Sequence, residues 1–170
     1  MFASKQFYIW NPIIGDYIVL PESPVIHIKP KACGFGFDSI TGEYKVIRIS
    51  KKKKLCSEIA DEKKFEAHVY TLGSDSWRVI ENVPKFSNTL HSNVFVNGNL
   101  HWVSRADDLK LISFNVRTEE FNGSELPPCF KNSKDHMIRD NVRGLAVLEE
   151  QLCLIDDHMG IWMMKRLWST

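Results

Sequence analysis

Short apolar runs, many of them alternating with polar residues, fill this chain, and turn residues separate them. The apolar positions recur with a period of two rather than the helical period of about 3.6, so the pattern predicts β-strands almost throughout. The predicted strands lie near Phe7–Trp10, Tyr17–Leu20, Ala32–Phe37, Tyr44–Ile49, Glu66–Leu72, Trp77–Ile80, Ser92–Val96, Leu100–Ser104, Leu109–Asn115, Glu120–Gly123, Arg143–Leu148, Leu152–Asp156 and Gly160–Lys165.

The connections between these runs favour antiparallel hairpins. Asn97-Gly98 stands between two apolar runs, and both residue types tolerate the positive φ of a tight two-residue turn. Glu149-Glu150 takes the same place in a later pair of runs, but glutamate suits such a turn poorly, so a looser loop is expected there. Residues 51–64 and 128–141 are predicted to be long insertions.

One pattern occurs twice. Residues 68–84 read HVYTLGSDSWRVIENVP and residues 112–127 read ISFNVRTEEFNGSELP, each with two aromatic residues seven positions apart, followed by an aliphatic–proline pair. The aromatic pairs are Tyr70 with Trp77 and Phe114 with Phe121. Two further predicted strands come before each of these segments: first a strand of small or aromatic residues (GFGF or NVFV), then an apolar strand. The same two-strand order occurs near the C-terminus, where the first strand reads GLAV.

Four-strand units of this length are typical of propeller blades, in which large rings fill the widening outer space between neighbouring sheets. The alternative is an ordinary β-sandwich, in which an aromatic–turn–aromatic hairpin is equally at home. Residues 7–21 match only the third and fourth strands of the unit, and the C-terminal residues stop in the fourth.

The fold class predicted is therefore all-β: a partial kelch-like β-propeller with about two complete four-stranded blades plus two partial blades. It is expected to form a single domain over residues 1–170 that is incomplete at both ends. We expect an open arc whose terminal sheets expose apolar surface and unpaired edges, and which therefore associates in solution.

Composition narrows the function classes. The 170 residues carry a net charge of +1 and 44% hydrophobic residues, so neither a general nucleic-acid binder nor a disordered chain is expected. No run approaches the roughly 18 apolar residues of a membrane span, and no secretory signal is visible. Four cysteines, at positions 33, 56, 129 and 153, are too widely spaced for a disulfide framework. Reduced thiols predict a cytoplasmic or nuclear protein, or both.

Few residues are candidates for chemistry. Asp156, Asp157 and His158 could hold a divalent metal or perform acid–base work, although such residues are also common in turns. His101 is a metal ligand or, more simply, a histidine packed between sheets. We predict no catalytic, cofactor-binding or metal-binding residue, and the sequence leaves the partner-binding residues unknown.

Two further motifs have structural explanations. Lys51 to Lys54 form a basic run that suits nuclear import or a phosphate contact, but nearby acidic residues favour a solvated loop. The same loop is a candidate partner contact, because binding residues concentrate on loops held by a rigid scaffold. Gly34-Phe35-Gly36 is too short for a dinucleotide fingerprint and suggests a strand that lies close to its neighbours.

Six motifs in one order resemble the plant F-box-associated, kelch-like domain: WNP, GFGFDSITGEYKVIRI, HVYTLGSDSWRVI, VFVNGNLHWV, ISFNVRTEEF and LCLIDD followed by IWMMK. The resemblance covers about residues 7 to 168. It implies a substrate receptor of SCF-type cullin–RING ubiquitin ligases that binds the protein substrate for ubiquitination. Such a receptor reaches the cullin-ligase adaptor through an F-box, which this chain lacks, so adaptor binding is not expected of it alone.

Three functions therefore stand side by side. The first is a protein-interaction module of a ubiquitin ligase, which would present loops to a target protein and bind neither nucleic acid nor membrane. The second is a kelch-like scaffold without a ligase connection. The third is a propeller enzyme centred on Asp156, Asp157 and His158, and the absence of any recognisable catalytic constellation weighs against it.

Overall fold

The computed structural model describes residues 6–25, 28, 30–52, 65–85, 93–105, 109–126, 142–156 and 160–164, and these residues contain strands and turns but no helix. The strands are β1 (Tyr8–Asn11), β2 (Asp16–Val19), β3 (Ala32–Asp38), β4 (Glu43–Lys51), β5 (Phe65–Thr71), β6 (Arg78–Ile80), β7 (Val94–Val96), β8 (Asn99–Arg105), β9 (Leu109–Asn115), β10 (Phe121–Glu125), β11 (Val142–Leu148), β12 (Gln151–Asp156) and β13 (Ile161–Met163). Every predicted strand is present, with bounds that differ by at most two residues.

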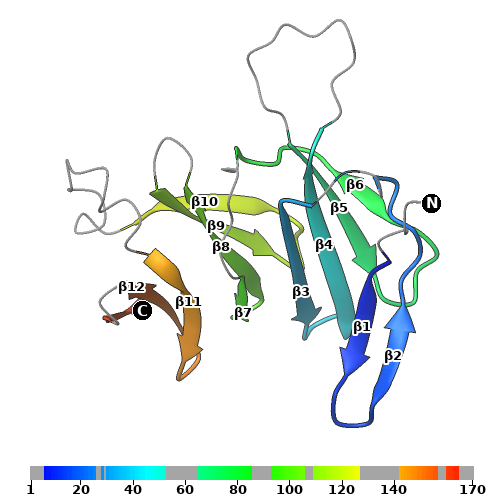
Figure 1. Ribbon diagram of the computed structural model, residues 1–170, viewed down its shortest axis with the longest axis horizontal. Helices are drawn as coiled ribbons and strands as arrows, with labels where there is room; N and C mark the ends of the chain where they lie inside the picture. Colours follow the sequence, from blue (N-terminus) through cyan, green and yellow to red (C-terminus); the bar gives the residue numbers. More distant parts are fainter. Residues whose placement is uncertain are drawn as a thin grey trace, which may run out of the picture.

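The strands form antiparallel sheets in chain order. β1 pairs with β2, β3–β6 and β7–β10 form two four-stranded sheets, and β11–β13 form a three-stranded sheet. Figure 1 shows these sheets side by side, from the blue N-terminal hairpin to the orange C-terminal sheet. The all-β, propeller-like class is therefore confirmed, and the described strands match the predicted grouping of two four-stranded sheets between two smaller ones.

Consecutive sheets pack face to face. One cluster of buried residues joins β1–β2 to β3–β6, a second joins β3–β6 to β7–β10, and a third joins β7–β10 to β11–β13. Examples, in the same order, are Leu20 with Val46, Ile47 with Trp102, and Val103 with Leu154. Each central sheet thus buries both of its faces, unlike a sheet in a two-layer sandwich, which buries one.

The first strand of the β3–β6 sheet approaches its neighbour very closely. A Cβ added at Gly36 would lie 2.6 Å from Cγ2 of Val116, and one at Gly34 would lie 2.7 Å from Cδ1 of Leu100. Both distances are well below a normal carbon–carbon contact, so any larger residue would force the neighbouring side chain or the β3 backbone to shift. The prediction that these glycines permit close packing is confirmed.

The two aromatic pairs occupy equivalent places. The rings of Tyr70 and Trp77 lie 5.5 Å apart and those of Phe114 and Phe121 lie 4.9 Å apart. In each sheet the pair lies in or directly beside the last two strands, with Trp77 just ahead of β6, and packs toward the preceding sheet. The repeated sequence therefore produces a repeated inter-sheet contact, as the blade pattern predicted.

Of the two turn predictions, one is confirmed and one is wrong. Asn97 and Gly98 have φ values of 51° and 73°, as expected for a tight primed turn. Glu149 and Glu150 were expected to form a looser loop, but they have φ values of 49° and 60° and connect the paired residues Leu148 and Gln151 directly. The sheet pairing of β11 with β12 imposes this turn, although the two glutamates do not favour it.

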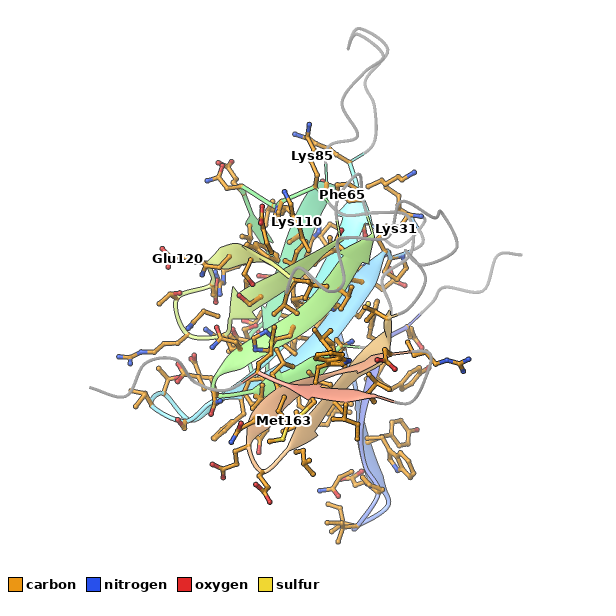
Figure 2. All side chains as sticks on the ribbon, turned by 90° about the vertical axis from the view of Figure 1, so that its left-hand side faces the viewer. Lys31, Phe65, Lys85, Lys110, Glu120 and Met163 are labelled. Atoms are coloured by element: carbon orange, nitrogen blue, oxygen red, sulfur yellow. The ribbon has the colours of Figure 1, made fainter. Side chains whose placement is uncertain are left out.

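Both terminal sheets expose apolar side chains. The exposed residues are Tyr8, Trp10, Ile13, Ile14, Tyr17, Ile18 and Val19 at the N-terminal hairpin, and Ile161, Trp162 and Met163 in β13. In Figure 2, Met163 lies toward one rim of the sheets, and Lys31, Phe65, Lys85 and Lys110 lie toward the opposite rim. Within the described part of the chain, no helix of a length and hydrophobicity to cross a membrane is found.

Candidate protein-interaction surface

The N-terminal hairpin has one face that is partly covered, at Ile9, and one open face. In its register Ile9 lies opposite Ile18, and Ile9 packs against the cluster that contains Val46. Residues on the other face alternate with these, as side chains in a strand must. Trp10 and Tyr17 lie opposite each other on that open face and are 63% and 59% exposed.

An apolar groove runs along β1, between the hairpin and the β3–β6 sheet. It consists of two adjoining pockets of about 370 and 350 Å³ that share Ile9, Trp10 and Phe35 in their walls. The first also contacts Tyr44 of β4, and the second reaches Cys33 of β3. Figure 1 shows β1 as the strand of the hairpin that lies toward β3 and β4, so the groove borders its inner edge.

The backbone of β1 offers hydrogen-bonding groups to this groove. The Leu20 N–H donates to the Phe7 carbonyl at 2.9 Å, and these two residues lie opposite each other if the register of the hairpin is extended by one. Alternation then directs the backbone of Ile9 toward β2 and that of Tyr8 and Trp10 toward the other edge. Among the strands that the structure describes, only β2 pairs with β1.

A buried arginine holds the segment that follows the hairpin. Nη2 of Arg48 donates to the carbonyl of Val25 at 2.7 Å and also to the carbonyl of Ile28. The Arg48 guanidinium lies 5.5 Å from the centre of the Phe7 ring, close enough for a cation–π contact. Burial lowers the pKa of Arg48, with a smaller opposing contribution from Cys33. These contacts fix the hairpin against β4.

An ionic network centred on Glu119 joins the β3–β6 and β7–β10 sheets. The Glu119 carboxylate accepts from Nζ of Lys45 at 2.9 Å and from both terminal nitrogens of Arg78 at 2.6 and 2.9 Å. Burial by itself would raise the pKa of Glu119, but the hydrogen bonds and charges of Arg78 and Lys45 together outweigh it and lower the pKa. Because Glu119 belongs to the β9–β10 turn and its partners to β4 and β6, the network fixes the distance between the sheets.

The candidate metal or acid–base cluster is only partly within the described residues. Asp156 ends β12, and its carboxylate accepts from the Gly160 N–H at 2.7 Å and from Nε1 of Trp162 at 2.8 Å. Both contacts close the connection to β13, which agrees with the turn interpretation of Asp156. Asp157 and His158 lie outside the described residues. Across residues 6–25, 28, 30–52, 65–85, 93–105, 109–126, 142–156 and 160–164, no group of three potential metal ligands occurs.

The remaining candidates have local explanations. His101 is half-buried in β8, and its Nδ1 has no hydrogen-bond partner among the residues that the structure describes. Burial lowers the pKa of His101 despite a hydrogen bond to the Val96 backbone. Burial raises the pKa of Cys33 to about 11, so its thiol is neutral and unreactive at neutral pH. Lys51 and Lys52 follow one another at the end of β4, and the rest of the basic run lies outside the described residues.

Sequence reasoning did not identify the groove or its residues. Tyr8, Trp10, Phe35 and Tyr44 looked like ordinary strand aromatics, and their exposure of 43% or more is visible only in the fold. The available signal was that residues 7–21 match the third and fourth strands of the repeat, to which β1 and β2 correspond.

Comparison with known proteins agrees with the architecture. The F-box associated beta propeller domain matches residues 1–170, which is the whole chain. The chain belongs to this family. Members are built around the propeller-like β fold seen here, and the plant F-box resemblance noted in the sequence is confirmed. No solved structure gives a significant match.

Several F-box proteins of Arabidopsis thaliana are similar to this family member. F-box protein At3g07870 is 30% identical over 95% of this chain and 43% of its own length. F-box/LRR-repeat/kelch-repeat protein At1g09650 is 29% identical over 97% of this chain and 44% of its own length. F-box protein CPR1 is 28% identical over 78% of this chain and 36% of its own length. The chain therefore spans less than half the length of these relatives.

Proposed function

We propose that this chain is the substrate-recognition region of an F-box protein in an SCF-type ubiquitin ligase. The observation that carries the proposal is the match of the F-box associated domain over residues 1–170, together with relatives that are named F-box proteins. The chain would act by placement: its exposed surfaces bind a target protein, and the ligase supplies the chemistry.

Two further properties belong to the proposal. We expect no catalytic activity, because the carboxylate of Asp156 is engaged in closing a turn. We expect a location in the cytoplasm or nucleus, which is supported by the free thiols of Cys33 and Cys153 within the described residues.

The test joins the chain to an F-box. A fusion of a relative's F-box to residues 1–170, the chain alone and the F-box alone are each expressed in plant cells and purified with their bound proteins. Adaptor should accompany both forms that contain the F-box. A defined set of target proteins should accompany both forms that contain the chain, and only the fusion should ubiquitinate them.

The outcomes separate the alternatives. If the fusion binds adaptor but none of the proteins captured by the chain becomes ubiquitinated, the kelch-like scaffold is the better description. A triple Asp156→Ala, Asp157→Ala, His158→Ala variant is the control for enzymatic function, and it should capture the same proteins as the parent chain.

A further inference from the structure

We propose that the segment after the N-terminal hairpin, residues 21–25 with Ile28, is a pH-sensitive strap that lies closed over β4 and β5 at neutral pH and opens locally when His68 takes up a proton. The strap belongs to the connection from β2 to β3. This inference goes beyond the proposed function and does not rest on it, because it concerns how one rim of the domain changes with acidity rather than what the domain binds.

Two side chains hold the strap. Nε1 of Trp77 donates to the Pro21 carbonyl at 2.9 Å, and Nη2 of Arg48 donates to the carbonyls of Val25, at 2.7 Å, and of Ile28. In the part of the chain that the structure describes, no strand pairs with the strap. A segment that is held at so few points can open without unfolding the sheet beneath it.

His68 lies beside the Arg48 anchor. The two residues are directly opposite each other in the pairing of β4 with β5, so their side chains are neighbours on one face of the sheet. Both are 2% exposed. Val46 and Tyr70 mark the same face two positions further along, and they pack toward the hairpin. The face that carries Arg48 and His68 is therefore the one that the strap covers.

The polar atoms beneath the strap are poorly satisfied. Nε of Arg48, Nδ1 of His68 and the hydroxyls of Ser50 and Ser23 are buried, and none has a hydrogen-bond partner among the described residues. Ser50 shares the face of Arg48, two positions along β4, and Ser23 belongs to the strap. Buried polar groups without partners cost free energy, so they weaken the closed state relative to an open one in which water reaches them.

The charges around His68 decide the sign of the pH effect. Burial lowers the pKa of His68, the Glu66 carboxylate opposes this change, and the Arg48 guanidinium adds to it. Burial raises the pKa of the Cys33 thiol to about 11, so that group is neutral and offers no countercharge. The titratable or charged residues that lie on this face of the sheet, at its edge or on the strap are Glu22, Lys31, Cys33, Arg48, Glu66, Tyr70 and Glu81.

Opening the strap admits water to His68, and its pKa then returns toward the ordinary value of about 6.5. The closed state has the lower pKa, so it binds the proton less readily than the open state. The closed state is therefore favoured above about pH 6.5 and loses that advantage as the pH falls further. From pH 7.5 to 5.0 the equilibrium constant for opening can rise by at most about thirtyfold, the limit for a closed state that excludes the proton entirely.

The direct test is hydrogen exchange of the Trp77 indole N–H, followed by NMR on the whole chain from pH 7.5 to 5.0. After correction for the intrinsic pH dependence of exchange, its protection should fall by about threefold to thirtyfold, beginning near pH 6.5. The backbone amides of Ile47 and Val69, inside the four-stranded sheet, should keep their protection because the opening is local.

Three histidine variants assign the response. His68→Gln removes the titrating group and should make the protection of the indole independent of pH. His101→Gln is the matched control, because His101 is a half-buried histidine of β8 whose pKa burial also lowers, and this variant should respond like the parent. His27→Gln, at a position outside the described residues, should also respond like the parent.

Arg48→Met tests the anchor. It should leave the Trp77 indole unprotected at both pH values, with circular dichroism showing that the sheets remain folded. The proposal is overturned if the indole protection of the parent does not change between pH 7.5 and 5.0, or if Ile47 and Val69 lose protection in parallel, which is global unfolding.

It is also overturned if His68→Gln responds like the parent, if His27→Gln abolishes the response, or if Arg48→Met keeps full protection. Should a variant fail to fold, the pH series on the parent chain still decides, because it needs no substitution.

Discussion

The contact between Gly36 and the neighbouring sheet gives the sharpest test of the packing. A Gly36→Ala substitution places a methyl group 2.6 Å from Cγ2 of Val116 and 3.0 Å from the Phe95 ring. Val116 is 1% exposed and β-branched, so it cannot rotate away from the new atom without disturbing the core. The two sheets must therefore separate locally, or the β3 backbone must shift.

The expected magnitude follows from two opposing effects. Overpacking a core by one methyl group costs about 1–3 kcal/mol. Replacing glycine by alanine restricts the unfolded chain and returns about 0.4–1 kcal/mol. At the middle of these two ranges the free energy of unfolding of Gly36→Ala falls by about 1.3 kcal/mol, and at most by about 2.6 kcal/mol, measured by urea denaturation with an unchanged slope.

A double-mutant cycle separates this contact from a general effect on the strand. Val116→Ala alone removes buried methyl groups and should cost about 2 kcal/mol. In the combined variant the new methyl of Ala at position 36 has space, so the loss should be smaller than the sum by about 1 kcal/mol or more. Additive losses in the double-mutant cycle would refute the close inter-sheet packing.

Three further predictions concern charge and turns. Glu119→Ala should lower the free energy of unfolding by about 2–3 kcal/mol, because buried Lys45 loses its closest partner. Arg78→Ala should cost less than about 1 kcal/mol, because the Arg78 side chain is 55% exposed. Equal losses for the two variants in urea denaturation would contradict the network. Replacing Glu149-Glu150 by Asn-Gly should raise the thermal midpoint, with a gain of about 1 kcal/mol, because both glutamates have positive φ; an unchanged midpoint would mean the turn is not strained. Burial lowers the pKa of His68 in the folded state, so the unfolded state takes up a proton first as the pH falls below about 6.5. The free energy of unfolding therefore declines there by up to about 1.4 kcal/mol per pH unit. His68→Gln should flatten this decline between pH 7.5 and 5.5, and parallel curves of stability against pH for the variant and the parent would exclude His68 as its source.

The strands and their grouping could be predicted because the information is local. Period-two alternation, the Asn97-Gly98 turn and the repeated aromatic spacing each act over fewer than ten residues, and the structure confirms all three. The prediction for the Glu149-Glu150 turn was wrong because a contact between strands overrode the local preference. Local preference argued against a tight turn there, but the pairing of β11 with β12 required one.

The candidate interaction surface could not be predicted in the same way. Whether an aromatic residue such as Trp10 or Phe35 is buried depends on which strands lie beside it, and that is set by contacts between residues far apart in the chain. The Lys45–Glu119 pair, 74 residues apart, has no signature in either local sequence.

The sequence by itself determined the β class, the strand positions, the unit of the repeat and the family, because these depend on short-range alternation and on motif order. Only the tertiary structure decided which faces are covered, that Gly36 touches Val116, and that the inner edge of β1 borders an apolar groove. The physical reason is that a side chain is buried only where a second surface packs against it. The sequence of one strand shows which side chains favour such contact, but only the fold shows which of them are covered.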